Sequence, residues 1–254
     1  KITRGTHYSH MPRRILIYAA FEPRPTESSK LFLEAAAAND FAIVYINNCN
    51  FNASEFLAER CHTIIHRANM GRDIGAYKDA YLYLHKSNLL VNATILGFAN
   101  DSVQFIGGSS LIDLFKRLVS LESSPSEAIF STVSFERGLH FQSFLFALKP
   151  SIFNSNAFYK FWAKYNFISS RRHSIVNGEI KLSKTIFGRI KNYSLLYGLH
   201  RFADCIAVSE VTPNFFQQIL PDIFRTKLLS SGKSSLVVDG MLNAYYESGN
   251  IYHI

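Results

Sequence analysis

Short hydrophobic runs alternate with stretches of helical periodicity along the first hundred residues. The apolar runs of strand length are residues 15–21, 41–47, 63–67 and 94–99. Between the first three runs, residues 27–38 and 53–60 favour helices. Fully apolar strands separated by helices are typical of a mostly parallel sheet with helices on both faces. Because active sites in such sheets lie beyond the carboxyl ends of the strands, the loops that follow these runs are where we expect the chemistry.

Two polar segments follow predicted strands. NMGRDIGAY at 69–77 leads into a helix whose apolar positions 74, 77, 81 and 84 share one face, and Asn100-Asp101-Ser102 follows the run 94–99 directly. A carboxylate at the end of a buried strand can hold a divalent cation and, through it, a nucleotide phosphate. Equally, Asp101 could serve as a turn or helix cap. In the first segment Arg72 could bind a phosphate and Asp73 a sugar hydroxyl, or Asp73 could simply be the N-cap of the helix.

The second half of the chain predicts an antiparallel element and several helices. Residues 127–134 and 139–148 read as two strands joined by a turn, and Asn154 is the predicted N-cap of an aromatic helix. A polar loop with Arg171, Arg172 and His173 precedes a helix predicted over 177–190. Smaller helices are expected at 211–220 and 238–247, which gives the α/β fold a helical C-terminal part.

Three polar groups in this half are candidates for chemistry. Glu179, in the first turn of its predicted helix, could be a general base or a carboxylate favoured by the helix dipole. His140 and Gln142 alternate on one face of their strand and could contact a sugar, while a buried, satisfied histidine is the structural alternative. The Arg171–His173 segment could clamp a diphosphate, contact an acidic membrane or be a solvated loop.

Composition narrows the classes of function. The chain has 48% hydrophobic and 18% charged residues, as expected of a globular protein, and its net charge of +8 favours anionic partners. Three cysteines without C-x-x-C spacing suggest neither a disulfide framework nor a zinc ribbon, so a reducing, cytoplasmic setting is expected. No apolar run is long enough to predict a membrane span. Without internal repeats, residues 12–254 are expected to form a single domain, and residues 1–11 a linker or a segment outside it.

In this order and spacing the motifs resemble those of the rhamnan synthesis protein F family, glycosyltransferases of bacterial surface polysaccharide assembly. The resemblance covers about residues 12–190. The segments that carry it are N-x-G-R-D-I-G at 69–75, Asn-Asp-Ser at 100–102, HFQSFLFAL at 140–148 with AFYKFW at 157–162, and NGEIKLSK at 177–184.

The resemblance implies a GT-A type, Rossmann-like domain that binds a nucleotide-sugar donor. The implied donor-binding residues are Asn69, Gly71, Arg72, Asp73, Asn100 and Gln142. Asp101 would stand at the position of the metal-binding Asp-x-Asp of such folds, but this chain offers one carboxylate there. Either a weakly held Mg²⁺ or Mn²⁺ or metal-independent transfer is therefore implied. Glu179 and His140 would be the catalytic residues, with Glu179 as the base of an inverting transfer.

The implied acceptor is a lipid-linked or polysaccharide glycan, such as an O-antigen, a capsule or a rhamnan, and rhamnose follows only from the family's name. Such an acceptor suits peripheral contact with an anionic membrane at the inner face of the cytoplasmic membrane.

Two alternatives remain open. The incomplete metal motif would also suit a non-catalytic nucleotide-sugar or carbohydrate-binding module. Nucleic-acid binding fits the positive charge, but the basic residues are scattered and no such motif is present, so no nucleic-acid partner is expected.

Overall fold

The computed structural model describes residues 1–197 apart from 7, 10, 23, 50–53, 104, 106, 107 and 135–138. The helices expected at 211–220 and 238–247 lie outside the described residues. The chain divides into two units, one of residues 1–131 and 141–196 and the other of residues 132–140 and 197–254. All the geometry of the candidate site described below belongs to the first unit.

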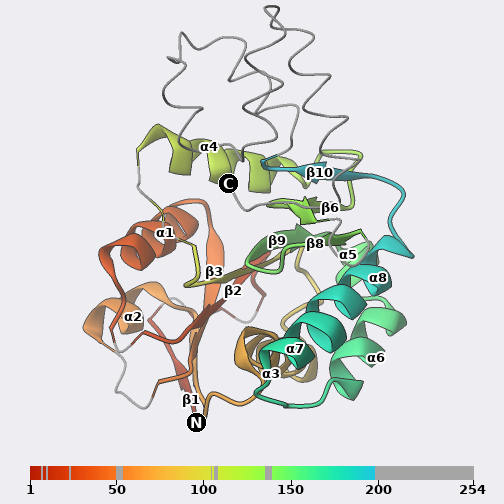
Figure 1. The fold of residues 1–254 in the computed structure, drawn as a ribbon. Coiled ribbons are helices and arrows are strands. Elements are labelled where there is room, and N and C mark those ends of the chain that lie inside the picture. The colour runs from red at the N-terminus through yellow and green to blue at the C-terminus, as the bar shows by residue number, and fades with distance from the viewer. Residues whose placement is uncertain are drawn as a thin grey trace, which may run out of the picture. The chain divides into compact units, whose positions relative to one another are not determined.

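The first unit is built on an eight-stranded sheet with the order β1-β4-β3-β2-β5-β9-β6-β10 (Figure 1). Its strands are β1 (Ile2–Arg4), β2 (Arg14–Ala20), β3 (Phe41–Asn47), β4 (Thr63–His66), β5 (Ile95–Asn100), β6 (Ala128–Phe130), β9 (Leu145–Leu148) and β10 (Tyr193–Leu195). A separate two-stranded sheet pairs β7 (Val133–Ser134) with β8 (His140–Phe141).

Four strands, β4, β3, β2 and β5, are parallel, and β9 runs antiparallel to both β5 and β6. This confirms the mostly parallel sheet. The chain moves from β2 outward to β3 and β4, and then returns to the other side of β2 as β5. The edge of the sheet beyond the ends of β2 and β5 is therefore the switch point, the place at which doubly wound sheets bind ligands.

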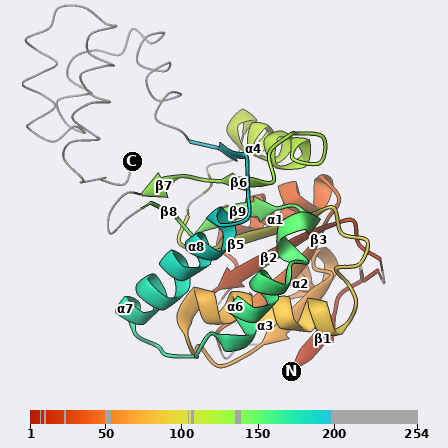
Figure 2. The same cartoon turned by 90° about the vertical axis from the view of Figure 1, so that its right-hand side faces the viewer.

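Helices cover both faces of the sheet, as predicted (Figures 1 and 2). One face carries α1 (Glu27–Ala38) and α4 (Ser109–Ser120), with α2 (Glu55–Arg60) beside α1. The other carries α3 (Arg72–Lys86), which packs on β2, and α6 (Asn156–Lys164), which packs on α3. The remaining helices are α5 (Pro150–Phe153), α7 (Arg171–His173), the π-helix η1 (Ser174–Ile180) and α8 (Lys181–Phe187).

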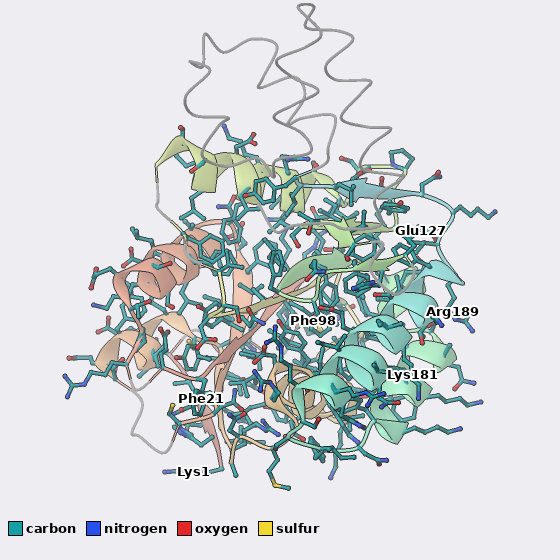
Figure 3. All side chains as sticks on the ribbon, in the orientation of Figure 1. Lys1, Phe21, Phe98, Glu127, Lys181 and Arg189 are labelled. Carbon is teal, nitrogen blue, oxygen red and sulfur yellow. The ribbon has the colours of Figure 1, made fainter. Side chains whose placement is uncertain are left out.

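Aromatic side chains fill the layer between the sheet and α3 and α6. Phe98, near the centre of Figure 3, stacks on Phe146 of the neighbouring strand, with a centroid distance of 4.5 Å, and on Trp162 of α6 at 6.1 Å. Tyr77 and Tyr81 of α3 are fully buried in the same layer. The aromatic stripe of α6 is thus core packing, which fixes α3 and its N-terminus against the sheet.

The structure differs from the sequence analysis at several element boundaries. Residues 2–4, which we expected to lie outside the domain, form the edge strand β1 against β4. The expected strand 139–148 is interrupted after Phe141, and the cap of α6 is Ser155, whereas Asn154 ends α5. The helix expected from 177 already begins at Arg171, where a loop was predicted, because the Ser170 hydroxyl caps it.

Among the described helices none has both the length and the hydropathy needed to cross a bilayer.

Candidate functional site

The polar segments predicted from the sequence meet at one edge of the sheet. Ala19 of β2 is paired with Asn100 of β5, and Ala20 is paired with Asn47 of β3. The residues that follow these three strands are therefore neighbours. Each loop leaves a strand whose last five residues are buried, so the polar groups at its start are held on rigid elements.

Asp101 joins the ends of β2 and β5. Its Oδ2 accepts a hydrogen bond of 2.5 Å from the backbone N–H of Phe21, and its own N–H donates to the carbonyl of Ala19 at 3.2 Å. Burial raises the pKa of the Asp101 carboxyl, while the bond from Phe21 opposes that shift. Asp101 lies in a turn, as one of the two structural alternatives predicted, but it caps no described helix.

Asp73 lies beside this carboxylate. The side-chain amide of Asn100 donates to Asp73 Oδ2 at 3.0 Å, which links the two polar segments. Burial raises the pKa of Asp73, and the nearby charge of Asp101 raises it further, against the lowering effects of Arg72 and Asn100. Asp73 makes no cap: the N-cap of α3 is Gly71, with no side-chain cap bond. Two carboxylates therefore share a partly buried site without a full neutralising partner.

The turn before α3 has a strained backbone. Gly71 has φ of 75° and Arg72 has φ of 56°, a left-handed conformation that costs free energy for a residue with a side chain. The Gly71 N–H donates to the Ser169 hydroxyl at 3.2 Å. Strain of this kind is often kept at ligand sites, and here the Asn69 and Arg72 side chains are exposed on the turn.

Arg67, which was not predicted from the sequence, binds the backbone just before α3. Its guanidinium donates to Asp79 Oδ2 at 2.6 Å, to Asn48 Oδ1 at 2.6 Å and to the Met70 carbonyl at 2.5 Å. Only 9% of its side chain is exposed. Arg67 thus connects the loops after β3 and β4 to α3. Nothing in the sequence distinguished it from a surface arginine at a strand end.

Glu179 reaches the same region from η1. Its Oε2 accepts hydrogen bonds from the Ser143 N–H at 2.8 Å and from the Ser143 hydroxyl at 2.7 Å. The Ser143 carbonyl in turn accepts from the Tyr77 hydroxyl at 3.1 Å. Burial raises the pKa of Tyr77, and the charges of Asp73, Asp101 and Glu179 raise it further, so these three carboxylates all lie within electrostatic reach of one phenol.

A π-helix presents Glu179, where the sequence predicted the first turn of an α-helix. The π-helix can pack this closely against α3 because residue 178 is a glycine. A Cβ at this position would lie only 2.9 Å from Cγ1 of Ile74 in α3. Short π-helical segments are rare and frequent at functional sites. The N-G-E sequence at 177–179 is thereby placed against the start of α3.

His140 and Gln142 do not share a strand face as predicted. His140 is buried in β8 and belongs to the second unit, whereas Gln142 is half-buried and lies just after the end of β8. The strand ends at Phe141 because Ser143 turns toward Glu179 and Phe141 N–H donates to the Ser183 hydroxyl.

A buried carboxylate at the end of β2 was also missed. Glu22 is 9% exposed; its Oε2 accepts from the Thr26 N–H, while its Oε1 has no hydrogen-bond partner among the described residues. The Tyr45 hydroxyl is also buried and has no hydrogen-bond partner among the described residues. Burial is the main cause that raises the pKa of Tyr45, and the charge of Glu22 is the second. A glutamate directly after an apolar run was the signal available in the sequence.

Within the described residues, no three His, Cys, Asp or Glu side chains come together as ligands for a metal ion. Asp73 and Asp101 are two neighbouring carboxylates, but they do not make a complete cation site by themselves.

Comparison with known proteins assigns the family. The family model described as "Rhamnan synthesis protein F" matches residues 43–227, which include both polar segments and η1. The chain belongs to the rhamnan synthesis protein F family. This confirms the resemblance inferred from the motifs.

A curated relative in this comparison, "Uncharacterized protein y4gN" of Sinorhizobium fredii (strain NBRC 101917 / NGR234), is 31% identical over 172 residues. The alignment takes in 66% of this chain and 44% of the relative, so the chain spans less than half of that protein.

Two crystal structures of the glycosyltransferase GlyE from Streptococcus pneumoniae TIGR4 also align with this chain. The first is 13% identical and covers 93% of this chain and 64% of its own, with a TM-score of 0.44. The second, an apo form, is 12% identical and covers 94% and 64%, with a TM-score of 0.35.

Proposed function

We propose that this chain is the glycosyltransferase domain of a polysaccharide-assembly protein and that it binds a nucleotide-sugar at the ends of β2, β3 and β5. One observation carries the proposal: the hydrogen bond between Asn100 and Asp73, which joins the two motif segments beside Asp101 at the switch point. Membership of the rhamnan synthesis protein F family supports a transferase that builds a surface glycan.

The donor's nucleoside would lie against the end of β2. Glu22 Oε1 and the Tyr45 hydroxyl are buried groups that gain hydrogen bonds if a ribose or base edge reaches them, and such gains favour binding. Phe21, whose backbone N–H binds Asp101, has an exposed ring that offers a stacking surface. Arg72, exposed on the strained turn, supplies a planar fork suited to the diphosphate.

The transfer itself requires a base and a stabilised leaving group. The acceptor hydroxyl attacks the anomeric carbon, its proton passes to Glu179, and the anomeric C–O bond breaks to release the nucleoside diphosphate. Ser143 fixes one oxygen of Glu179, so the carboxylate is oriented before the acceptor arrives. One base and in-line attack invert the anomeric centre. Rhamnose remains the donor sugar suggested by the family's description, and a lipid-linked glycan the proposed acceptor.

A divalent cation has an incomplete site in this part of the chain. Asp73 and Asp101 would attract Mg²⁺ or Mn²⁺ electrostatically, but the described residues supply no third carboxylate, histidine or cysteine ligand. We therefore assign the stabilisation of the leaving diphosphate to Arg72 and assign no step to a metal ion. The same observation favours the second candidate, a non-catalytic module that binds nucleotide-sugars.

Donor binding tests the proposal directly. Ligand-observed NMR with UDP-, GDP- and dTDP-sugars, with and without Mn²⁺, should show binding of one nucleotide class that is lost in Asp101→Ala. Asp113→Ala, on the exposed side of α4, is the matched control and should bind normally. Binding together with transfer to an extracted lipid-linked glycan supports the enzyme. Binding without transfer supports the non-catalytic module, and unchanged binding by folded Asp101→Ala contradicts the proposed site.

A further inference from the structure

A second site lies on the outer side of the helical layer, between α6 and α8. These two helices pack against each other beside α3 (Figures 1 and 2). A groove of about 720 Å³ runs between them. Its lining residues are Ala157, Lys160, Phe161, Lys164, Tyr165, Asn166, His173, Asn177, Lys181, Lys184, Thr185, Gly188 and Arg189.

The groove is strongly and uniformly basic. Five of the lining side chains are lysine or arginine, and none of the described lining residues is Asp or Glu. All five are exposed, and in the described part of the chain none of them takes part in an ion pair. Figure 3 labels Lys181, at the start of α8, and Arg189, two residues after its end. Five cations gathered without counter-charges repel one another and create a positive field, which an anionic partner would neutralise.

Exposed apolar side chains accompany these cations. Ile168 is 45% exposed and Val176 is 36% exposed; Ile168 comes two residues after the lining residue Asn166, and Val176 directly precedes the lining residue Asn177. Arg171 and Arg172, exposed on α7, lie between Ile168 and Val176 in the sequence. A soluble anion needs only the positive charge. A bilayer interface, in contrast, also binds exposed apolar side chains that lie next to lysines.

We propose that the α6–α8 groove and its apolar neighbours bind the phosphate headgroups of an anionic bilayer surface. The lysines and Arg189 contact the headgroup phosphates, while Ile168 and Val176 enter the boundary between headgroups and acyl chains. Each basic side chain near such a surface contributes about 1 kcal/mol, so several together give stable but salt-sensitive attachment.

The π-helix connects this surface to the candidate base. Asn177 lines the groove and accepts a hydrogen bond from Lys181 Nζ at 2.6 Å, whereas Glu179, two residues on, turns inward to Ser143. Residues two apart on a helix do not share a face. Attachment through the groove therefore leaves Glu179 directed into the protein. Vesicle binding requires no donor and no turnover, so its outcome is independent of the proposed transfer.

The test is co-sedimentation of the full chain with vesicles of phosphatidylcholine alone or containing about 30% phosphatidylglycerol, at low and high salt. We expect binding to the anionic vesicles only, reduced at high salt. Lys160→Glu/Lys184→Glu should weaken it at least about tenfold, from the contribution of about 1 kcal/mol per basic residue. Lys86→Glu/Lys116→Glu makes the same charge change at exposed positions outside the groove and should bind nearly as wild type. All four lysines are exposed, so both variants should keep the wild-type circular dichroism spectrum.

Two further arms separate a lipid surface from a soluble anion. Ile168→Ser should also weaken vesicle binding, since an apolar contact is lost without any change of charge. Calorimetric titration with inorganic pyrophosphate should give the same result for the wild type and for Lys160→Glu/Lys184→Glu, because any pyrophosphate bound at Arg72 in the proposed donor site does not involve these lysines. Pyrophosphate binding that is lost in Lys160→Glu/Lys184→Glu, equal losses of vesicle binding in both lysine pairs, or equal binding to neutral vesicles would each overturn the proposal.

Discussion

Asp73 and Asp101 keep two carboxylates close together in a partly buried place. Burial and their mutual repulsion raise the pKa of Asp73, and burial raises that of Asp101, so the folded state holds their protons more tightly than the unfolded chain does. For a carboxyl with a raised folded pKa, stability falls as the pH rises from its ordinary value, 3.8 for Asp73, through the folded value. Functional sites often keep such carboxylates, although their charges destabilise the folded state, because the function requires them.

Neutralising one of the pair should therefore stabilise the protein. Asp73→Asn keeps an oxygen that can accept from Asn100 and removes the charge, so we expect its Tm to exceed that of the wild type at pH 7. The difference should shrink toward pH 4, where the wild-type carboxyl gains its proton. Thermal unfolding followed from pH 4 to 8 measures this, with Asp113→Asn as the control. A difference that stays constant with pH would contradict the electrostatic origin.

Glu179 carries the prediction about catalysis. Glu179→Gln retains an oxygen to accept from Ser143 and loses the ability to take a proton, so turnover should fall about 10²- to 10⁴-fold while donor binding is preserved. Single-turnover rates and donor affinity measured on the same preparation separate the two effects. If turnover is retained, the base lies elsewhere.

The residues of the candidate site differed in how strongly the sequence singled them out. Asp73, Asn100, Asp101 and Glu179 were predicted because a carboxylate or amide directly after an apolar run, or within a recognised motif, stands out in the sequence. Arg67 and Ser143 did not stand out, since their roles arise from partners that are distant in the chain: Arg67 binds Asn48 and Asp79, and Ser143 binds Glu179. Such pairings are set by tertiary structure, which periodicity does not encode.

The loop that precedes α3 depends on Arg67 as a connecting element. Arg67→Ala removes three hydrogen bonds and leaves Asp79 without its ion-pair partner. Because the Asp79 side chain is 35% exposed, we expect a loss of about 2–4 kcal/mol in unfolding free energy, somewhat below that for a fully buried pair. Arg60→Ala, which breaks a surface pair, should change it by about 0.5 kcal/mol or less. Chemical denaturation of both variants measures the two losses in unfolding free energy. Equally small losses would show that the hydrogen bonds of Arg67 contribute little to stability.

The contact between η1 and α3 depends on the absence of a side chain at Gly178. Gly178→Ala forces the new Cβ against Ile74, so we expect a loss of about 1–3 kcal/mol, as for overpacked cores. Turnover should fall more than stability predicts, because η1 carries Glu179. Gly188→Ala, at the end of α8, supplies a control with a milder contact to the Lys184 carbonyl at 3.2 Å. Full turnover in Gly178→Ala would mean that the position of η1 is not critical.

Elements with strong local signals were predicted well. Strands β2 to β5 were recognised because each is buried on both faces and reads as an unbroken apolar run. The break between β8 and β9 and the π-helix were not recognised, because both arise where Glu179 binds Ser143 and Gly178 meets Ile74. Arg171–His173 were read as a loop since their side chains are polar, although Ser170 provides the cap that begins the helix.

At the scale of the whole molecule, the segment before β2 was expected to lie outside the domain because its residues are polar and exposed. The structure attaches it by its backbone instead. β1 pairs with β4, Gly5 N–H donates to the His62 carbonyl at 3.1 Å, and the Tyr8 ring lies 4.5 Å from the His62 ring. Edge strands need no apolar pattern, since hydrogen bonds to the neighbouring strand hold them, and here the added strand covers the otherwise open edge of β4.

Gly5 allows a single substitution to test whether this segment belongs to the folded unit. A Cβ at this position would overlap the carbonyl oxygen of Cys61, a backbone atom that has no rotamer by which to move away. Gly5→Ala should therefore detach the segment from the sheet. Amide hydrogen exchange of residues 2–9 should then be faster, by about tenfold for each 1.4 kcal/mol of free energy lost from the contact between the segment and the sheet. Thr3→Ala, an exposed change in β1, should leave the exchange nearly unchanged. Protection in β2, β3 and β5 should persist in both variants, because their buried pairing does not involve β1. Unaltered exchange in residues 2–9 of Gly5→Ala would mean that the segment is held independently of this contact, whereas exchange throughout the sheet would make β1 part of the cooperative core.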